Sequence, residues 1–184
     1  GKRLLTVGTD CAVGKMYTVL ALEKAMKSKG MNADFRATGQ TGIFIAGEGI
    51  PVDAVVSDFI AGAAELVSPA NAPNHWDLIE GQGSLFHPAY AAVTLGLIHG
   101  SQPDAMILCH KAGLETIDGH PDYKIPDIKD CIRVYEDAAN LTNPKAQVVA
   151  LSINTSLMDE REALEYLALI SATYHLPCFD PVRT

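Results

Sequence analysis

The sequence predicts an α/β fold, a three-layer α/β/α sandwich built around a mostly parallel central sheet. Apolar runs of strand length alternate with helical patterns along the whole chain, which is typical of a parallel sheet covered by helices on both faces. The chain has 184 residues, which is enough for one sizeable buried core. We therefore expect residues 1–184 to form a single domain.

Five strands and five helices are predicted in alternation. Each strand is predicted by a short apolar run, and each helix by apolar residues three or four apart with proline or glycine near an end. The predicted strands are Leu4–Val7, Ala33–Thr38, Trp76–Ile79, Ala105–Cys109 and Val148–Ile153. The predicted helices are Lys15–Lys29, Pro51 through Leu66, Pro88 to Gly100, one from Pro126, and about Asp159–Tyr174. The first of them is expected to bury Met16, Val19, Leu20 and Met26 and to end before a left-handed Gly30.

Polar segments follow these strands. Because parallel strands end at the same edge of a sheet, and the ligand crevice lies beyond their carboxyl ends, we expect these segments to converge on one pocket. They are Gly8–Lys15, Gly39–Gly42, Glu80–Ser84, His110–Gly113 and Asn154–Thr155.

Composition excludes several classes of partner. The formal net charge of −8 argues against nucleic acid, whose binding depends on clustered lysine and arginine. No apolar run approaches the roughly 20 residues that cross a bilayer, so we expect no membrane association. Cys11, Cys109, Cys131 and Cys178 are scattered, as in reduced cytoplasmic proteins. We expect a cytoplasmic protein with a small-molecule substrate.

The segment from Leu4 to Lys15 has the layout of a phosphate-binding loop. An apolar strand leads into Gly8, and Gly14-Lys15 opens a helix, so backbone N–H groups and one ammonium can hold phosphate oxygens. Five residues separate the two glycines, where the standard loop has four. The alternative is a tight strand-to-helix turn whose lysine faces water. We expect a phosphate-bearing cofactor to be held by Gly8, Thr9, Asp10, Cys11, Ala12, Val13, Gly14, Lys15, Met16, Tyr17 and Thr18.

The residue after Lys15 departs from the usual pattern. The hydroxyl side chain that ligates Mg²⁺ in the standard loop is replaced by Met16, whose thioether is a poor ligand for a hard cation. Thr18 is almost one helical turn further on and would have to reach back. Metal-dependent phosphoryl transfer is therefore in doubt.

Other strand-end residues are candidates for catalysis and binding. Glu80 is the best carboxylate, either catalytic or the ion-pair partner of Lys15, and Asp58 would join it if Mg²⁺ binds. His110 is a candidate general base, or a histidine hydrogen-bonded within its loop. Arg36 could bind a substrate carboxylate or be an edge charge, and Asn154 could recognise a base or form a turn.

Three of these segments resemble loops of dethiobiotin synthetase. The likeness covers Gly-Thr-Asp-Cys-Ala-Val-Gly-Lys at 8–15, Gly-Gln-Thr-Gly at 39–42 and Glu-Gly-Gln-Gly-Ser at 80–84. It implies a P-loop NTPase-like fold, with Gln40 and Thr41 near the substrate. It also implies that the carboxylate of Glu80 faces a metal, and that Gly81, Gln82, Gly83 and Ser84 approach the substrate.

A second resemblance spans nearly the whole chain. The segments 8–16, 39–42, 52–59 and 80–84, with His-Pro-Ala-Tyr at 87–90, are similar to a family known as a domain of unknown function, some of whose members are D-glutamate N-acetyltransferases. Met16 itself belongs to that pattern. The resemblance implies acetyl-CoA as cofactor and D-glutamate as acceptor, with His110 or Glu80 as base and Lys15 or loop N–H groups stabilising the oxyanion.

The resemblance also implies an additional N-terminal domain, and the start at Gly1, directly before a strand, agrees with it. We expect this chain to be the C-terminal domain of a longer protein that forms a homo-oligomer. Two alternative functions stay open: a ligase or kinase that uses ATP with Mg²⁺, and a nucleotide-binding module without catalysis.

Overall fold

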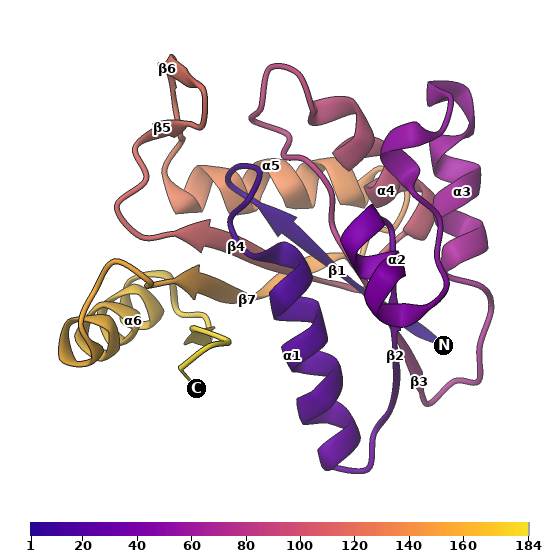
Figure 1. The fold of residues 1–184 in the computed structure, drawn as a ribbon, viewed down its shortest axis with the longest axis horizontal. Helices are drawn as coiled ribbons and strands as arrows, with labels where there is room; N and C mark the ends of the chain where they lie inside the picture. The colour runs from indigo at the N-terminus through magenta and orange to yellow at the C-terminus, as the bar shows by residue number, and fades with distance from the viewer. Residues whose placement is uncertain (184) are drawn as a thin grey trace.

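The computed structural model describes residues 1–183 and contains a six-stranded, fully parallel sheet (Figure 1). The strand order is β2-β3-β1-β4-β7-β8, so β1 lies in the middle of the sheet between β3 and β4. The strand bounds are β1 Lys2–Gly8, β2 Asn32–Arg36, β3 His75–Ile79, β4 Ala105–Lys111, β7 Gln147–Asn154 and β8 Cys178–Phe179. All five predicted strands are confirmed, and β8 is an additional one.

Each face of the sheet carries its own apolar core, because successive side chains of a strand point to opposite faces. Leu4 contributes to one core, together with residues of α1 (Lys15–Ser28), and Leu5 contributes to the other. The second core also takes residues from α3 (Ile60–Val67), α4 (Ala91–Ser101), α5 (Ile128–Asn140) and α6 (Glu160–Tyr174). Figure 1 shows α1 and α5 on opposite sides of the strands. The predicted three-layer α/β/α sandwich is therefore confirmed.

The first helix follows the prediction closely but buries fewer apolar side chains. Val19 and Met26 are buried, whereas Met16 and Leu20 are only partly buried, and Thr18 is buried in their place. Gly30 has φ +75°, the left-handed conformation expected just beyond a helix end.

The single helix predicted from Pro51 through Leu66 is wrong. The segment forms two short 3₁₀ turns, η1 (Val52–Ala54) and η2 (Ser57–Phe59), before α3 begins. Val55 and Val56, between the two turns, both have non-helical backbone dihedrals, with ψ values of 137° and 134°, which interrupt any continuous helix. Phe59 and Leu66 are 67% and 76% exposed, so the apolar spacing did not mark a buried face. A further helix, α2 (Gln40–Ala46), lies where only a turn was predicted.

The prediction that Gly100 closes the next helix is also wrong. Gly100 lies inside α4, and a Cβ atom built there would be 2.2 Å from the carbonyl oxygen of Ala61 in α3. The glycine therefore permits close packing of the two helices, and α4 ends one residue later, capped by Gln102 at φ +47°.

The last third of the chain adds a small hairpin above the sheet edge. Strands β5 (Thr116–Ile117) and β6 (His120–Lys124) pair antiparallel within the loop that follows β4. Helix α5 is capped by Asp127, one residue after Pro126, and α6 begins with a capping box between Asp159 and Glu162. None of the described helices is long and apolar enough to cross a membrane.

Candidate functional site

The loop between β1 and α1 curls around the N-terminal end of the helix, as the sequence predicts. Ala12 and Gly14 have φ values of +52° and +102°, a left-handed conformation that non-glycine residues adopt infrequently. Among the described residues, the structure records no acceptor for the backbone N–H groups of Gly14, Lys15 and Met16. Unpaired N–H groups at the start of a helix form a cradle for anions.

Buried hydrogen bonds hold the start of this loop in place. The Gly8 carbonyl oxygen accepts from the Tyr135 hydroxyl at 2.6 Å and from the Ser84 hydroxyl at 2.8 Å. The Thr9 N–H donates to the carbonyl oxygen of Cys109 on the neighbouring strand at 3.0 Å. The loop is therefore attached to α5, to the segment after β3 and to β4.

A cavity of about 560 Å³ opens beside the loop, within the usual size range of small-molecule sites. The P-loop and the turn after β3 supply most of its wall. The lining residues are Cys11, Ala12, Gly14, Lys15, Met16, Tyr17, Asp53, Glu80, Gly81, Gln82, Gly83, Tyr90 and Val93. Of the five strand-end segments predicted to converge on one pocket, these two do so. Gly39–Gly42, His110–Gly113 and Asn154–Thr155 contribute no lining residue to the cavity.

Lys15 is the cation in the wall of this cavity. Its side chain is 7% exposed, and its Nζ donates to the carbonyl oxygen of Asp10 at 2.8 Å. Burial lowers the pKa of Lys15, because the charged ammonium loses solvation. An anionic ligand would restore that lost stabilisation of the charge. The alternative of a lysine that faces water is wrong.

Glu80 is the buried carboxylate among the residues that line the cavity. It is 3% exposed, and its Oε2 accepts hydrogen bonds from the backbone N–H groups of Thr38 at 2.9 Å and Gly39 at 3.0 Å. Burial raises the pKa of Glu80 despite these two bonds, which favour the ionised form. Glycine is required nearby, because a Cβ atom on Gly42 would lie 2.3 Å from Oε2.

The remaining residues of the Glu80–Ser84 turn either line the cavity or support the loop between β1 and α1. Gly81, Gln82 and Gly83 line the cavity, and a Cβ atom on Gly81 would come within 1.7 Å of the carbonyl oxygen of Thr6. Ser84 is fully buried and donates to Gly8 instead, so its hydroxyl supports the loop.

Several candidates from the sequence lie outside the cavity. The Arg36 guanidinium is paired with Asp77, with 2.6 Å between Nε and Oδ1. The ring of His110 is buried, its Nδ1 lies 2.9 Å from the Thr9 hydroxyl, and burial lowers its pKa. The Asn154 side chain accepts from the backbone N–H of Ser156 at 3.0 Å, which is the turn alternative.

Four further candidates lie on helical segments that keep them out of the cavity wall. Thr18 donates to the Gly14 carbonyl oxygen and lies 2.8 Å from the Ser152 hydroxyl, so it does not reach back toward the loop. Gln40 and Thr41 are exposed on α2. Asp58 is exposed in η2, where the expected buried helix face does not exist, whereas Asp53 lines the cavity together with Glu80.

Sequence reasoning missed Asp53, Tyr90 and Val93 among the lining residues. Asp53 lies in a 3₁₀ turn that no periodicity marks. The segment His-Pro-Ala-Tyr at 87–90 was the available signal for Tyr90, because it follows directly on the Glu80–Ser84 turn.

Comparison with known proteins places these features in a family. The chain matches, over residues 1–184, the family DUF1611, described as a domain of unknown function (DUF1611_C) P-loop domain. A D-glutamate N-acetyltransferase from Pseudoalteromonas is 54% identical over 183 residues, which is 100% of this chain and 55% of that protein. The crystal structure of a DUF1611 family protein from Anabaena variabilis is 44% identical, with a TM-score of 0.93 over 99% of this chain and 54% of that one.

A more distant structure shows the fold alone. Cobyrinic acid a,c-diamide synthase from Mycobacterium smegmatis, solved with bound ADP and magnesium, has a TM-score of 0.58 at 14% identity, covering 95% of this chain and 83% of that one. The present chain spans about half the length of the D-glutamate N-acetyltransferase that it matches. The chain belongs to the DUF1611 family and forms its P-loop domain.

Proposed function

We propose that the protein containing this chain transfers the acetyl group of acetyl-CoA to the amine of D-glutamate. The observation that carries this proposal is the similarity to a D-glutamate N-acetyltransferase, which is 54% identical over a region that spans the whole chain and therefore all the segments that line the cavity. The N–H groups of Gly14, Lys15 and Met16 and the Lys15 ammonium would hold phosphate oxygens of the cofactor.

Met16, the residue after the P-loop lysine, supports a cofactor whose phosphates are bound but not transferred. Met16 lines the cavity where the standard loop has a hydroxyl ligand for Mg²⁺, and the Thr18 hydroxyl is bound to Gly14 and Ser152. Acetyl transfer leaves the phosphates of CoA unchanged. It therefore does not need the hydroxyl that phosphoryl transfer uses.

Glu80 is the better placed of the two proposed bases, because it lines the cavity and His110 does not. In the proposed reaction, a Glu80 oxygen takes a proton from the substrate ammonium. The amine nitrogen then attacks the thioester carbonyl carbon and the carbon–sulfur bond breaks. The nitrogen gives up its second proton as the amide forms, and the departing CoA thiolate takes up one proton. A pKa raised by burial brings the carboxylate closer to the basicity that this step needs.

A second function, an ATP-dependent ligase or kinase, is favoured by one observation. Asp53 and Glu80 line the same cavity as the P-loop and could hold Mg²⁺ beside a nucleotide. A non-catalytic nucleotide-binding module is the third alternative. The cytoplasmic location and the homo-oligomeric state stay predictions.

Thermal shift and product formation test the proposal on the full-length protein. We expect acetyl-CoA and CoA to raise the melting temperature more than ATP does, with or without Mg²⁺. At a hundredfold excess over the dissociation constant the stabilisation is about 2.7 kcal/mol. Chromatography should detect more acetylated product from D-glutamate than from L-glutamate.

Lys15→Met should abolish the shift by acetyl-CoA, whereas Lys24→Met, on the exposed face of the same helix, should leave it unchanged. Stabilisation by ATP with Mg²⁺ alone, without acetylated product, would contradict the proposal and favour the second function.

A further inference from the structure

Three potential metal ligands of different chemistry meet at the edge of the P-loop. Asp10 and Cys11 belong to the loop, and His87 follows the Glu80–Ser84 turn after β3. Each offers one ligand atom, and these atoms all lie within 4.8 Å of one another. Asp10 and His87 are 0% and 5% exposed, so this is not a group of solvated surface charges.

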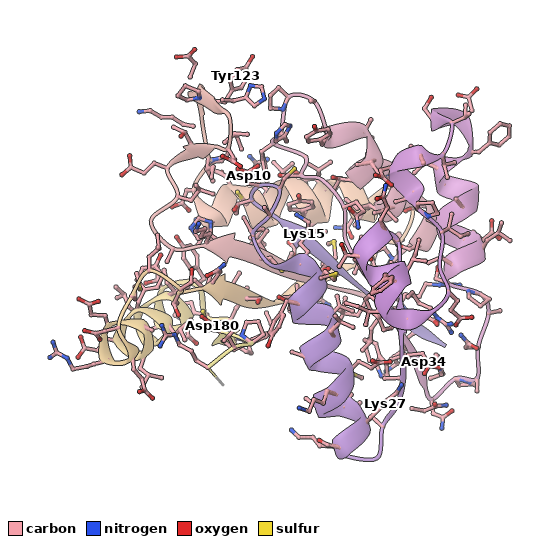
Figure 2. All side chains as sticks on the ribbon, viewed as in Figure 1. Asp10, Lys15, Lys27, Asp34, Tyr123 and Asp180 are labelled. Atoms are coloured by element: carbon pink, nitrogen blue, oxygen red, sulfur yellow. The ribbon has the colours of Figure 1, made fainter. Side chains whose placement is uncertain are left out.

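The surroundings hold these side chains in position. The two carboxylate oxygens of Asp10 accept from the backbone N–H of Cys11 at 2.6 Å and of Asp118 at 2.7 Å, and each oxygen keeps a further lone pair. The His87 ring stacks on Tyr90 with centroids 4.5 Å apart, and His120 meets its plane edge-on at 5.1 Å. Figure 2 shows Asp10 between Lys15 and the hairpin that carries Tyr123. The hydrogen bonds to the Asp10 carboxylate are of the kind that support carboxylate ligands of metals.

We propose that Asp10, Cys11 and His87 bind a divalent cation of borderline softness, of which Zn²⁺ is the natural probe. A set of one thiolate, one imidazole and one carboxylate suits Zn²⁺, whereas Mg²⁺ and Ca²⁺ prefer oxygen ligands. The thiolate and the carboxylate together balance the charge of the cation. Tetrahedral coordination places ligand atoms about 3.3–3.8 Å apart, so a contraction of at most about 1–1.5 Å closes the site.

The arrangement leaves one coordination position open. Cys11 is among the residues that line the 560 Å³ cavity and Asp10 and His87 are not, so a metal held by the three would lie at the edge of the cavity. Three protein ligands with a free fourth position are typical of zinc sites that bind a substrate or water. The free position would take an oxygen atom of the bound ligand. The site does not depend on the acetyl chemistry proposed above.

Metal binding requires two proton changes within the site. His87 Nδ1 accepts a hydrogen bond from the backbone N–H of Ala89 at 3.1 Å, so in the metal-free state Nε2 carries the ring proton. Coordination through Nε2 moves that proton to Nδ1, and the hydrogen bond from the Ala89 N–H to His87 Nδ1 is then lost. The thiol of Cys11 releases its proton to solvent, as cysteine ligands do.

Titration of the metal-free, full-length protein with Zn²⁺ and with Co²⁺ tests the site without an activity assay. We expect one equivalent of Co²⁺ to produce a sulfur-to-cobalt charge-transfer absorption, and Zn²⁺ to displace it. Cys11→Ser should abolish this band. His87→Gln should weaken Zn²⁺ binding by more than the roughly 10- to 100-fold that loss of an outer-shell partner costs.

Matched controls are Cys178→Ser, a partly buried thiol on β8, and His175→Asn, an exposed histidine at the end of α6. Both should bind Co²⁺ as the wild type does. Circular dichroism of the metal-free variants checks that they fold. Absence of a stoichiometric charge-transfer band in the wild-type protein overturns the proposal whatever the variants do, as does its survival in Cys11→Ser. Either result leaves the acetyltransferase proposal untouched.

Discussion

Replacing Glu80 by glutamine separates its proposed chemical role from its structural one. The amide oxygen of glutamine can still accept from the N–H groups of Thr38 and Gly39, which now bond Oε2 at 2.9 and 3.0 Å. The amide cannot take up a proton at neutral pH. If Glu80 is the general base, kcat/KM should fall about 10²- to 10⁴-fold, which corresponds to about 2.7–5.4 kcal/mol of transition-state stabilisation.

Glu80→Ala should behave differently, because it removes the acceptor of two buried N–H groups. Leaving each of them unsatisfied costs about 1–3 kcal/mol, hence about 2–6 kcal/mol in total. For a chain of this size each kcal/mol corresponds to about 2–4 °C, so the melting temperature should drop by roughly 4–24 °C. Glu80→Gln should melt close to the wild type.

The assay is the release of CoA thiol from acetyl-CoA in the presence of D-glutamate, combined with thermal melting of each variant. His110→Gln, at the other candidate base, should retain activity within about tenfold, because His110 lies outside the cavity and its Nδ1 is bonded to Thr9. Activity of Glu80→Gln within tenfold of the wild type, at an unchanged melting temperature, would refute the assignment of Glu80 as base.

Three further outcomes are expected from the buried polar groups. Burial raises the pKa of Glu80 in the folded state above its unfolded value. The stability that the protonated carboxyl contributes is therefore complete below the unfolded pKa and is lost as pH rises through the folded pKa. The melting temperature of the wild type should fall over this pH range, and that of Glu80→Gln should not. Arg36→Gln should cost about 3 kcal/mol in urea unfolding, because Asp77 is 1% exposed and would lose its charged partner; a cost under 1 kcal/mol would contradict this. Tyr135→Phe should cost about 1–3 kcal/mol and weaken cofactor binding in a thermal-shift titration, because the hydroxyl that bonds the Gly8 carbonyl is removed; unchanged stability and affinity would show that this anchor is dispensable.

Local chemistry made much of this structure predictable. The strands are short apolar runs between polar turns, and the P-loop has glycines and a lysine at spacings that few other structures require, so both were located from the residues alone. The helix from Pro51 was not predicted correctly, because Val55 and Val56 continue an apolar spacing while adopting non-helical dihedrals. Gly100 was assigned to a helix end because its contact with Ala61 of α3 is invisible in the sequence.

The same division holds for the site. The sequence by itself determined the α/β class, the position of the strand-to-helix loop at Gly8–Lys15 and the position of Glu80 at a strand end, because local backbone conformation follows from residue type and spacing. Only the tertiary structure decided that Arg36 pairs with Asp77, that Asp53 and Tyr90 line the cavity, and that His87 lies beside Cys11. These contacts join residues distant in the chain, and they depend on how helices and loops pack over the sheet, which no local pattern encodes.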